Sequence, residues 1–262
     1  MATILDTIAE YAKIRVNNAK KEISLEEMKE KAFGVTNKTP FAFENALKND
    51  RISFICECKK ASPSKGVIAN DFPYLDIAKE YEIAGADCIS VLTEPKWFMG
   101  KNEYLTDIQN DVSIPCLRKD FTIDEYMIYE AKAIGADAVL LICSLLSGDK
   151  IAKYIEICDE LGISAVVEAH DEDEIKSGVD AGARIIGVNN RNLKDFSVDV
   201  TNSARLRELV PDDITFIAES GIKTHDDIVK LEGYNVNAVL IGETLMKADD
   251  KRAMLNELRD GK

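Results

Sequence analysis

Short apolar stretches rich in β-branched residues recur along the chain, separated by longer segments with charged residues and helical spacing. The stretches begin roughly 20 to 35 residues apart, which is the length of a strand, a helix and two loops. Runs that are apolar at nearly every position are typical of strands buried on both faces of a parallel sheet. The strands predicted in this way cover residues 52–58, 87–92, 114–117, 138–142, 163–167, 184–188, 214–218 and 237–241.

The joints between these elements also repeat. Residues 85–87, 135–137 and 182–184 read Gly-Ala-Asp, Gly-Ala-Asp and Gly-Ala-Arg, and each follows a helical segment just before a strand. Glycine at this position supplies the left-handed residue that ends a helix. Residues 235–238 resemble a degenerate fourth copy.

Eight strand–helix units without a linker of proline, glycine and serine predict an α/β fold, a single closed (β/α)8 TIM barrel over residues 1–262. An open, doubly wound sheet is the rival, but G-x-G-x-x-G does not follow the first strand and a Walker-type G-K-[ST] is missing. Residues 1–48 precede the barrel, and their helical spacing and the capping box at 24–27 predict an N-terminal helical extension covering the barrel mouth. The sequence leaves open whether this extension is a structural lid or also covers a substrate.

The balance of charges excludes some classes of function. The chain has 47 acidic and 33 basic residues and a formal net charge of -14, and such a surface repels nucleic acid and anionic membranes. We find no signal-peptide pattern at the N-terminus and no apolar run that approaches the ~20 residues of a membrane span. The six cysteines are scattered through apolar segments. We therefore expect a cytoplasmic protein with reduced cysteines that binds neither nucleic acid nor membrane.

Polar residues follow the predicted strands, at the end where (β/α)8 barrels carry their active sites. They are Glu57, Lys59 and Lys60 after the first strand, Thr93 and Glu94 after the second, Arg118, Lys119 and Asp120 after the third, Ser144 after the fourth, Glu168 after the fifth, Asn189, Asn190 and Arg191 after the sixth, and Glu219, Ser220, Gly242 and Glu243 after the last two. Because strand side chains alternate, Glu57 and Lys59 share a face, which we assign to the barrel axis. Cys56 and Cys58 then pack beneath the helices.

Two glycine-containing turns, at 220–221 and 242–243, follow the seventh and eighth strands. Barrels frequently bind phosphate there through backbone N–H groups, so the pair predicts a phosphate site. The two histidines, His170 and His225, have no partners at metal or triad spacing, and we predict no metal site. Acid–base chemistry then falls to lysines and carboxylates, and a lysine can serve as a general acid or base if burial or neighbouring cations lower its pKa.

Residues 54–66, Phe-Ile-Cys-Glu-Cys-Lys-Lys-Ala-Ser-Pro-Ser-Lys-Gly, resemble the signature of the indole-3-glycerol phosphate synthase family. The resemblance spans nearly the whole chain, and the Glu-x-Lys-x-x-Ser-Pro-Ser pattern is its most specific part. Its further segments are 90–94, Trp97, Phe98, 117–121, 167–170, 187–193, 218–221 and 240–243. Cys56, Cys58 and Trp97 depart mildly from the family pattern.

The resemblance implies conversion of 1-(2-carboxyphenylamino)-1-deoxyribulose 5-phosphate to indole-3-glycerol phosphate, with loss of CO2 and then water and with no cofactor. The catalytic residues that it implies are Lys119 as general acid of ring closure, Glu168 in the proton transfers, Lys59 for the substrate carboxylate and the leaving hydroxyl, Glu57 and Asn189 as orienting groups, and Glu219 near the reacting centre. The substrate-binding residues that it implies are Ser62, Arg191, Ser220, Gly221, Gly242 and Glu243 for the phosphate, and Phe98 and Leu140 as apolar walls for the aromatic ring.

Two other functions fit a phosphate-binding barrel. Phosphoribosylanthranilate isomerase typically uses a cysteine–aspartate pair, and no cysteine of the first strand faces the barrel axis, because Cys56 and Cys58 lie on the other face. A catalytically silent sensor or scaffold has no need of Lys59, Lys119 and Glu168, and all three are present. We expect a phosphorylated small-molecule substrate and a monomer, and association with other enzymes of the tryptophan pathway is left open.

Overall fold

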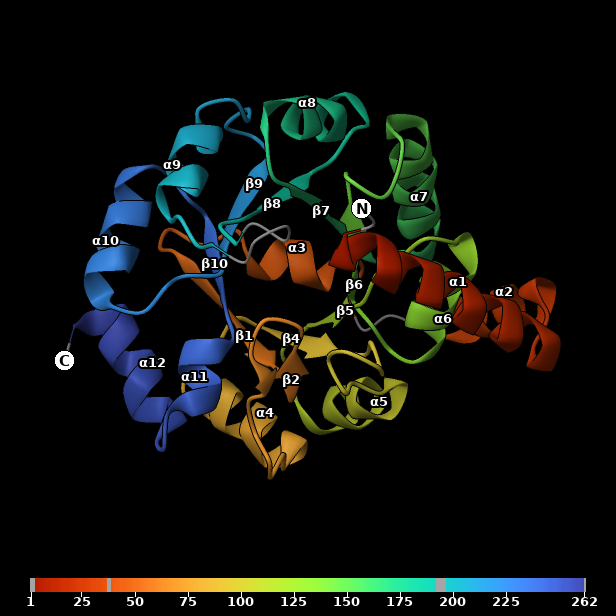
Figure 1. The fold of residues 1–262 in the computed structure, drawn as a ribbon, viewed down its shortest axis with the longest axis horizontal. Coiled ribbons are helices and arrows are strands. Elements are labelled where there is room, and N and C mark those ends of the chain that lie inside the picture. The colour runs from red at the N-terminus through yellow and green to blue at the C-terminus, as the bar shows by residue number, and fades with distance from the viewer. Residues whose placement is uncertain (1–2, 37–38, 192–196, 262) are drawn as a thin grey trace.

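Eight parallel strands close a barrel within the residues that the computed structural model describes, which are 3–36, 39–191 and 197–261 (Figure 1). The strands are β1 (Ser53–Cys58), β4 (Cys88–Leu92), β5 (Cys116–Lys119), β6 (Ala138–Ile142), β7 (Ser164–Ala169), β8 (Ile185–Asn189), β9 (Thr215–Glu219) and β10 (Ala238–Ile241). Each pairs with its neighbour in the chain, and β1 pairs with β10 to complete the ring. The predicted barrel is confirmed, although part of the motif at 187–193 lies outside the described residues.

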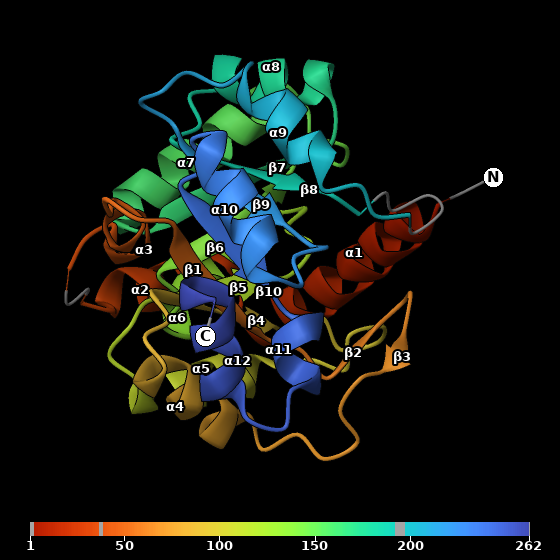
Figure 2. The ribbon, with the colours of Figure 1, turned by 90° about the vertical axis from the view of Figure 1, so that its left-hand side faces the viewer.

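Helices surround the outer face of the barrel, and two helices of the N-terminal extension, α1 and α3, lie at its ends (Figures 1 and 2). The described residues form twelve helices in all. They are α1 (Ile4–Glu22), α2 (Leu25–Gly34), α3 (Ala42–Ala46), α4 (Tyr74–Ile83), α5 (Asn102–Asp111), α6 (Glu125–Ala133), α7 (Gly148–Leu161), α8 (Glu172–Asp180), α9 (Thr201–Arg207), α10 (His225–Gly233), α11 (Glu243–Lys247) and α12 (Lys251–Asp260). A small antiparallel hairpin of β2 (Ala61–Ser62) and β3 (Gly66–Val67) follows β1, and the sequence did not predict it. Among the described helices, none is long and apolar enough to cross a membrane.

Local sequence explains several helix ends. The Ser24 side chain accepts a hydrogen bond from the Glu27 N–H, and the Glu27 carboxylate accepts one from the Ser24 N–H, which confirms the predicted capping box. At the helix ends before β4, β6 and β8, Gly85, Gly135 and Gly182 have φ angles of 87°, 96° and 86°. These left-handed residues confirm the repeated joint.

The barrel wall separates two apolar layers. Side chains that face the axis form an inner cluster, which includes Ile55, Leu117, Leu140, Val166, Ile217 and Leu240. Cys56 and Cys58 belong instead to the outer cluster beneath the helices, where they are 0% and 1% exposed. Alternation along β1 therefore directs Glu57 to the same side as Ile55, toward the axis, as predicted.

The N-terminal extension is divided between the two ends of the barrel. Figure 2 shows α1 on the same side as the β2–β3 hairpin and α3 on the opposite side. In α3, the Glu44 N–H donates to the hydroxyl of Ser164, the first residue of β7, and Phe43 joins the inner cluster. The helix α3 thus closes the amino-terminal end of the barrel, and α1 is the part of the extension that lies at the mouth.

Candidate active site

A cavity of about 630 Å³ opens at the carboxyl ends of the barrel strands. It is lined by every residue that the sequence predicted for catalysis or substrate binding, namely Glu57, Lys59, Ser62, Phe98, Lys119, Leu140, Glu168, Asn189, Arg191, Glu219, Ser220, Gly221, Gly242 and Glu243. Several of these polar residues, including Lys119 and Glu168, lie within the strands rather than beyond them, because the ladders run one or two residues past the apolar runs.

The floor of the cavity holds two lysine–carboxylate pairs. The ammonium group of Lys119 on β5 donates to Glu219 on β9 and lies 3.5 Å from Oε2 of Glu168 on β7. The ammonium group of Lys59 donates to Glu57 on β1. Since the three carboxylate residues are each 4% exposed or less, the site concentrates charge where water has little access.

This concentration of carboxylates sets the pKa values. Burial by itself lowers the pKa of Lys119, but the charges of Glu219, Glu168 and Glu57 outweigh burial and raise the pKa above its usual value. The lowering of a lysine pKa that the sequence analysis considered therefore does not occur at Lys119. Burial raises the pKa of Glu219 to about 7, and Glu168 and Glu57 act in the same direction while Lys119 opposes them. A firmly protonated lysine thus lies beside a carboxyl group that titrates near neutral pH.

Two glycines leave room for these pairs. A Cβ atom on Gly187 would lie 2.5 Å from Oε1 of Glu219, and one on Gly242 would lie 2.8 Å from Nζ of Lys59 and against the Glu57 carboxylate. Gly242 therefore accommodates side chains of the site, in addition to the phosphate role predicted for it. The need for glycine at 187 was not apparent from the sequence.

Cations gather at the end of the cavity near β8 and β10. The Glu243 carboxylate lies 2.6 Å from Lys247, 3.5 Å from Arg191 and 3.7 Å from Lys65. Although burial opposes them, these cations lower the pKa of Glu243. Among the described residues, three cations contact this one carboxylate, so the charge of Glu243 does not cancel all of theirs.

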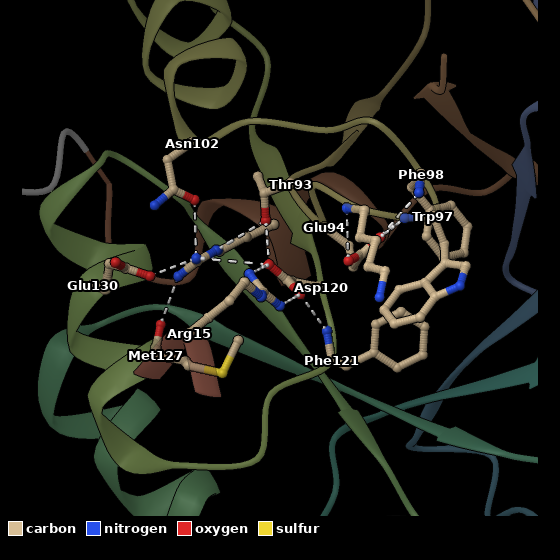
Figure 3. Close-up of polar contacts among 12 residues, drawn as sticks. Arg15, Thr93, Glu94, Trp97, Phe98, Asn102, Asp120, Phe121, Met127 and Glu130 are labelled. Atoms are coloured by element: carbon tan, nitrogen blue, oxygen red, sulfur yellow. Dashed lines mark hydrogen bonds and ion pairs between the residues drawn. The ribbon is translucent and has the colours of Figure 1, made fainter. Parts of the chain in front are cut away.

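Glu94 holds the loop that carries Phe98 into the cavity. Its carboxylate is fully buried and accepts hydrogen bonds from the backbone N–H groups of Lys96, Trp97 and Phe98, at 3.0, 2.7 and 3.0 Å (Figure 3). The Trp97 ring meets Tyr11 of α1 edge to face, with ring centroids 5.5 Å apart. Sequence analysis placed Glu94 at the rim and did not identify this role, because the acceptor and its donors meet only through the turn.

A buried ionic network supports β5 from behind Lys119. Asp120 binds Arg15 of α1 and the Thr93 hydroxyl, and the Arg118 guanidinium binds Thr93 and Glu130 (Figure 3). Arg118 and Asp120 are 2% and 1% exposed. Alternation places Arg118 on the face opposite Lys119, whereas Asp120 follows the end of β5 and also lines the cavity. The sequence did not identify this network, although Arg15 continues the apolar stripe of α1 and so signals a buried partner.

Taken together, a barrel mouth with buried lysine–carboxylate pairs at its centre and a cationic end defines a (β/α)8-barrel enzyme that carries out acid–base chemistry. The described residues contain no cluster of His, Cys, Asp and Glu that could hold a metal ion.

Comparison with known proteins agrees with this class. The family model of indole-3-glycerol phosphate synthase matches residues 5–258. Two relatives named indole-3-glycerol phosphate synthase are 61% identical, from Ruminiclostridium cellulolyticum, covering 98% of each chain, and 53% identical, from Endomicrobium trichonymphae, covering 98% of this chain and all of the relative. The chain belongs to the indole-3-glycerol phosphate synthase family. It is therefore a carboxy-lyase of tryptophan biosynthesis, as the sequence resemblance predicted.

More distant structures share the fold alone. A 3-hexulose-6-phosphate synthase superimposes with a TM-score of 0.65 at 17% identity, over 79% of this chain and 98% of that one. A tryptophan synthase complex from Pyrococcus furiosus gives a TM-score of 0.59 at 16% identity, over 79% of this chain and 97% of that one. These likenesses agree with a (β/α)8 barrel.

Proposed function

We propose that the protein closes the pyrrole ring of 1-(2-carboxyphenylamino)-1-deoxyribulose 5-phosphate and releases CO2 and then water to give indole-3-glycerol phosphate. The observation that carries the proposal is the contact of Lys119 with both Glu219 and Glu168 on the floor of the mouth cavity. The substrate has an anionic group at each end, and Lys59 and Arg191 line the same cavity.

Lys119 acts as the general acid of ring closure. When the aromatic ring attacks the ribulose carbonyl, negative charge develops on the carbonyl oxygen and makes that oxygen strongly basic. An ammonium group with a raised pKa remains protonated until that moment, so it stabilises the charge and then donates its proton. Glu219 and Glu168 hold the ammonium group in place.

The remaining polar residues orient the substrate and exchange protons with it. Glu168 takes part in the proton transfers that restore the aromatic ring, and Glu219 lies beside it. Lys59 binds the substrate carboxylate and protonates the leaving hydroxyl, and its ammonium group is oriented by Glu57. Asn189, whose Oδ1 accepts a hydrogen bond from the Arg191 N–H at 3.0 Å, contacts the substrate hydroxyls and fixes the loop that carries Arg191.

The two ends of the substrate have different surroundings. The phosphate lies against Ser62, Arg191, Ser220, Gly221, Gly242 and Glu243, and at Glu243 the contact is the backbone N–H because the carboxylate is occupied by cations. Ser220 and Gly221 both have positive φ angles, 66° and 84°, which produces a tight turn at this end. The aromatic ring packs between Phe98 and Leu140.

The N-terminal helix α1 completes the site. Leu5 and Ile8 of α1 line the cavity and cover its apolar part. We propose that residues 1–48 and the barrel form one domain, that the protein acts as a monomer in the cytoplasm, and that any association with other tryptophan-pathway enzymes is not required for turnover.

A fluorescence assay for the indole product tests the function. Wild-type protein supplied with the substrate should produce indole fluorescence, and Lys119→Met should reduce turnover by about 10³-fold or more while the cooperative unfolding transition is retained. Inorganic phosphate should compete with the substrate. A Lys119→Met rate close to wild type contradicts the role of Lys119, and a lack of competition at high phosphate concentration contradicts the phosphate site.

A further inference from the structure

His170 lies between two carboxylates directly beside the proposed reaction centre. It follows Glu168 by two residues at the carboxyl end of β7. Its Nδ1 lies 3.2 Å from Oε2 of Glu174 in the first turn of α8, and the same oxygen accepts the His170 backbone N–H at 2.8 Å. Its Nε2 lies 3.5 Å from Oε1 of Glu168, is buried, and has no hydrogen-bond partner within the described residues.

The imidazole also lines a second cavity, next to the one that holds the proposed reaction centre. Glu168 lines the substrate cavity, whereas His170 and Glu174 line a second cavity of about 530 Å³. Asn189 and Leu5 line both and form the partition between them. The ring of His170 therefore connects the second cavity to Glu168 without being part of the lining of the substrate cavity.

The overall reaction consumes one proton. The substrate enters as a carboxylate anion, loses its carboxyl carbon as neutral CO2 and loses a hydroxyl group as water. Balance of charge and hydrogen then demands that one proton be taken up from solvent in each turnover. Glu168 is 2% exposed, and Leu5 and Ile8 line the substrate cavity above it, so a carrier beside Glu168 would supply the proton while the substrate occupies the cavity.

We propose that His170 is a proton-relay residue that delivers this proton to Glu168; the inference rests on the proposed role of Glu168. The imidazolium donates its Nε2 proton to Oε1 of the Glu168 carboxylate, and the neutral imidazole keeps its Nδ1–H on Glu174. Glu168 passes the proton from its other oxygen, Oε2, to Lys119, which lies 3.5 Å away and has given its own proton to the substrate carbonyl oxygen. A proton from water in the second cavity restores the imidazolium, so each turnover transfers one solvent proton and leaves the protein unchanged.

The charges around His170 suit a cationic carrier. Glu168 faces it from β7, Glu174 and Asp171 from α8, Glu219 from β9, and Asp6 and Asp199 line the adjoining cavity. Lys119 contacts the other oxygen of the same carboxylate, Oε2 of Glu168. Burial lowers the pKa of His170, but the hydrogen bond to Glu174 and the charges of Glu168, Glu174 and Glu219 outweigh it and raise the pKa above its usual value.

The test replaces His170 with asparagine and uses the other histidine as a matched control. His225→Asn changes a ring whose Nδ1 contacts the Leu258 carbonyl away from both cavities. We expect His170→Asn to lower kcat by about 10- to 100-fold, less than loss of a direct general acid, with little change in KM or in the unfolding midpoint. The solvent deuterium isotope effect on kcat should increase, and added imidazole should restore kcat while sodium chloride of equal ionic strength should not. His225→Asn should match wild type in kcat, KM, unfolding midpoint, isotope effect and response to imidazole.

Two results overturn the relay. One is a His170→Asn enzyme with wild-type kcat and isotope effect. The other is a slow His170→Asn enzyme that imidazole does not rescue and whose isotope effect is unchanged, since this is the behaviour of a structural residue. A parallel Glu168→Gln variant separates the relay from the underlying site assignment. If Glu168→Gln retains wild-type activity, the role of Glu168 fails; if Glu168→Gln is inactive and His170→Asn is normal, only the relay fails.

Discussion

Arg15 of the N-terminal helix binds the carboxylate of Asp120 through two hydrogen bonds, at 2.7 and 3.1 Å. Asp120 directly follows Lys119 in the chain and is almost completely buried. The pair therefore connects the helix that covers the mouth to the strand end that carries the proposed general acid. Because both hydrogen bonds come from one planar guanidinium, they fix the orientation of the carboxylate as well as its position.

Arg15→Met should destabilise the protein and slow it. The substitution leaves the Asp120 carboxylate buried with weaker partners, so we expect the free energy of unfolding at pH 7 to fall by about 3 kcal/mol and kcat to fall severalfold. Arg15 lowers the pKa of Asp120 against the effect of burial, so the stabilisation is present above the unfolded-state pKa and is lost as pH falls through the folded-state value. The difference in free energy of unfolding between wild type and Arg15→Met, measured by urea unfolding, should therefore become smaller below about pH 4.

Lys13→Met on the same helix is the control for Arg15→Met. Lys13 pairs with Glu10, and both side chains are exposed, so the loss of this pair should leave stability and turnover unchanged. Equal effects of the two substitutions would show that α1 responds to any loss of charge and that Arg15–Asp120 has no special role.

Much of this fold was predictable because its information is local. Each barrel strand is apolar at nearly every position, so the strands could be found from short segments of sequence. In a parallel barrel the carboxyl ends of all strands meet at one mouth, whatever the exact bounds of each strand. For this reason residues as distant in sequence as Glu57 and Glu243 could be assigned to one site, and both line the mouth cavity. The predicted strands end early at Lys119 and Glu168 because polarity was taken as the end of a strand, whereas the backbone ladder continues.

The unpredicted features depend on contacts between distant segments. Arg15 and Asp120 are 105 residues apart, and their contact is set by how α1 crosses the mouth. The pKa of Lys119 is raised because carboxylates from three other strands converge on it, which a list of strand ends does not reveal. The short helix α3 lies at the opposite end of the barrel because Phe43 and Leu47 fill the inner cluster there, and helical spacing alone does not distinguish the two ends.

Glu94→Gln should weaken substrate binding. A glutamine side chain has one oxygen that accepts hydrogen bonds, and its NH2 group only donates. At least one of the N–H groups of Lys96, Trp97 and Phe98 therefore loses its acceptor. We expect the loop that carries Phe98 to loosen, KM to rise by about tenfold, equivalent to about 1.4 kcal/mol, and kcat to change less. Steady-state kinetics measures both parameters, and the control is Glu80→Gln, a substitution of an exposed residue of α4. Equal KM values for Glu94→Gln and Glu80→Gln would contradict this role of Glu94.

Gly187→Ala should reduce turnover without unfolding the protein. The added methyl group would meet Oε1 of Glu219 at 2.5 Å, so the carboxylate must move away from Lys119. We expect kcat to fall by about 10- to 100-fold, since a shift of about 1 Å in a catalytic array has an effect of that size. Gly34→Ala is the matched control because nothing lies within 4 Å of the added atom, and it should leave kcat unchanged and stability equal or higher. A Gly187→Ala enzyme with wild-type kcat would contradict the tight fit.

Glu219→Gln should change how stability depends on pH. Burial raises the pKa of Glu219 from 4.5 to about 7 in the folded protein. Between these two values the folded state binds a proton that the unfolded state has released, so the free energy of unfolding of the wild type falls as pH rises through this window. Glutamine does not ionise and removes this fall. We expect the stability of Glu219→Gln relative to wild type to increase by about 2 kcal/mol between pH 5 and pH 8, measured by urea unfolding at both pH values. Glu232→Gln, an exposed residue on α10, should show no such change. Curves for Glu219→Gln and wild type that stay parallel from pH 5 to pH 8 would mean that Glu219 is ionised throughout.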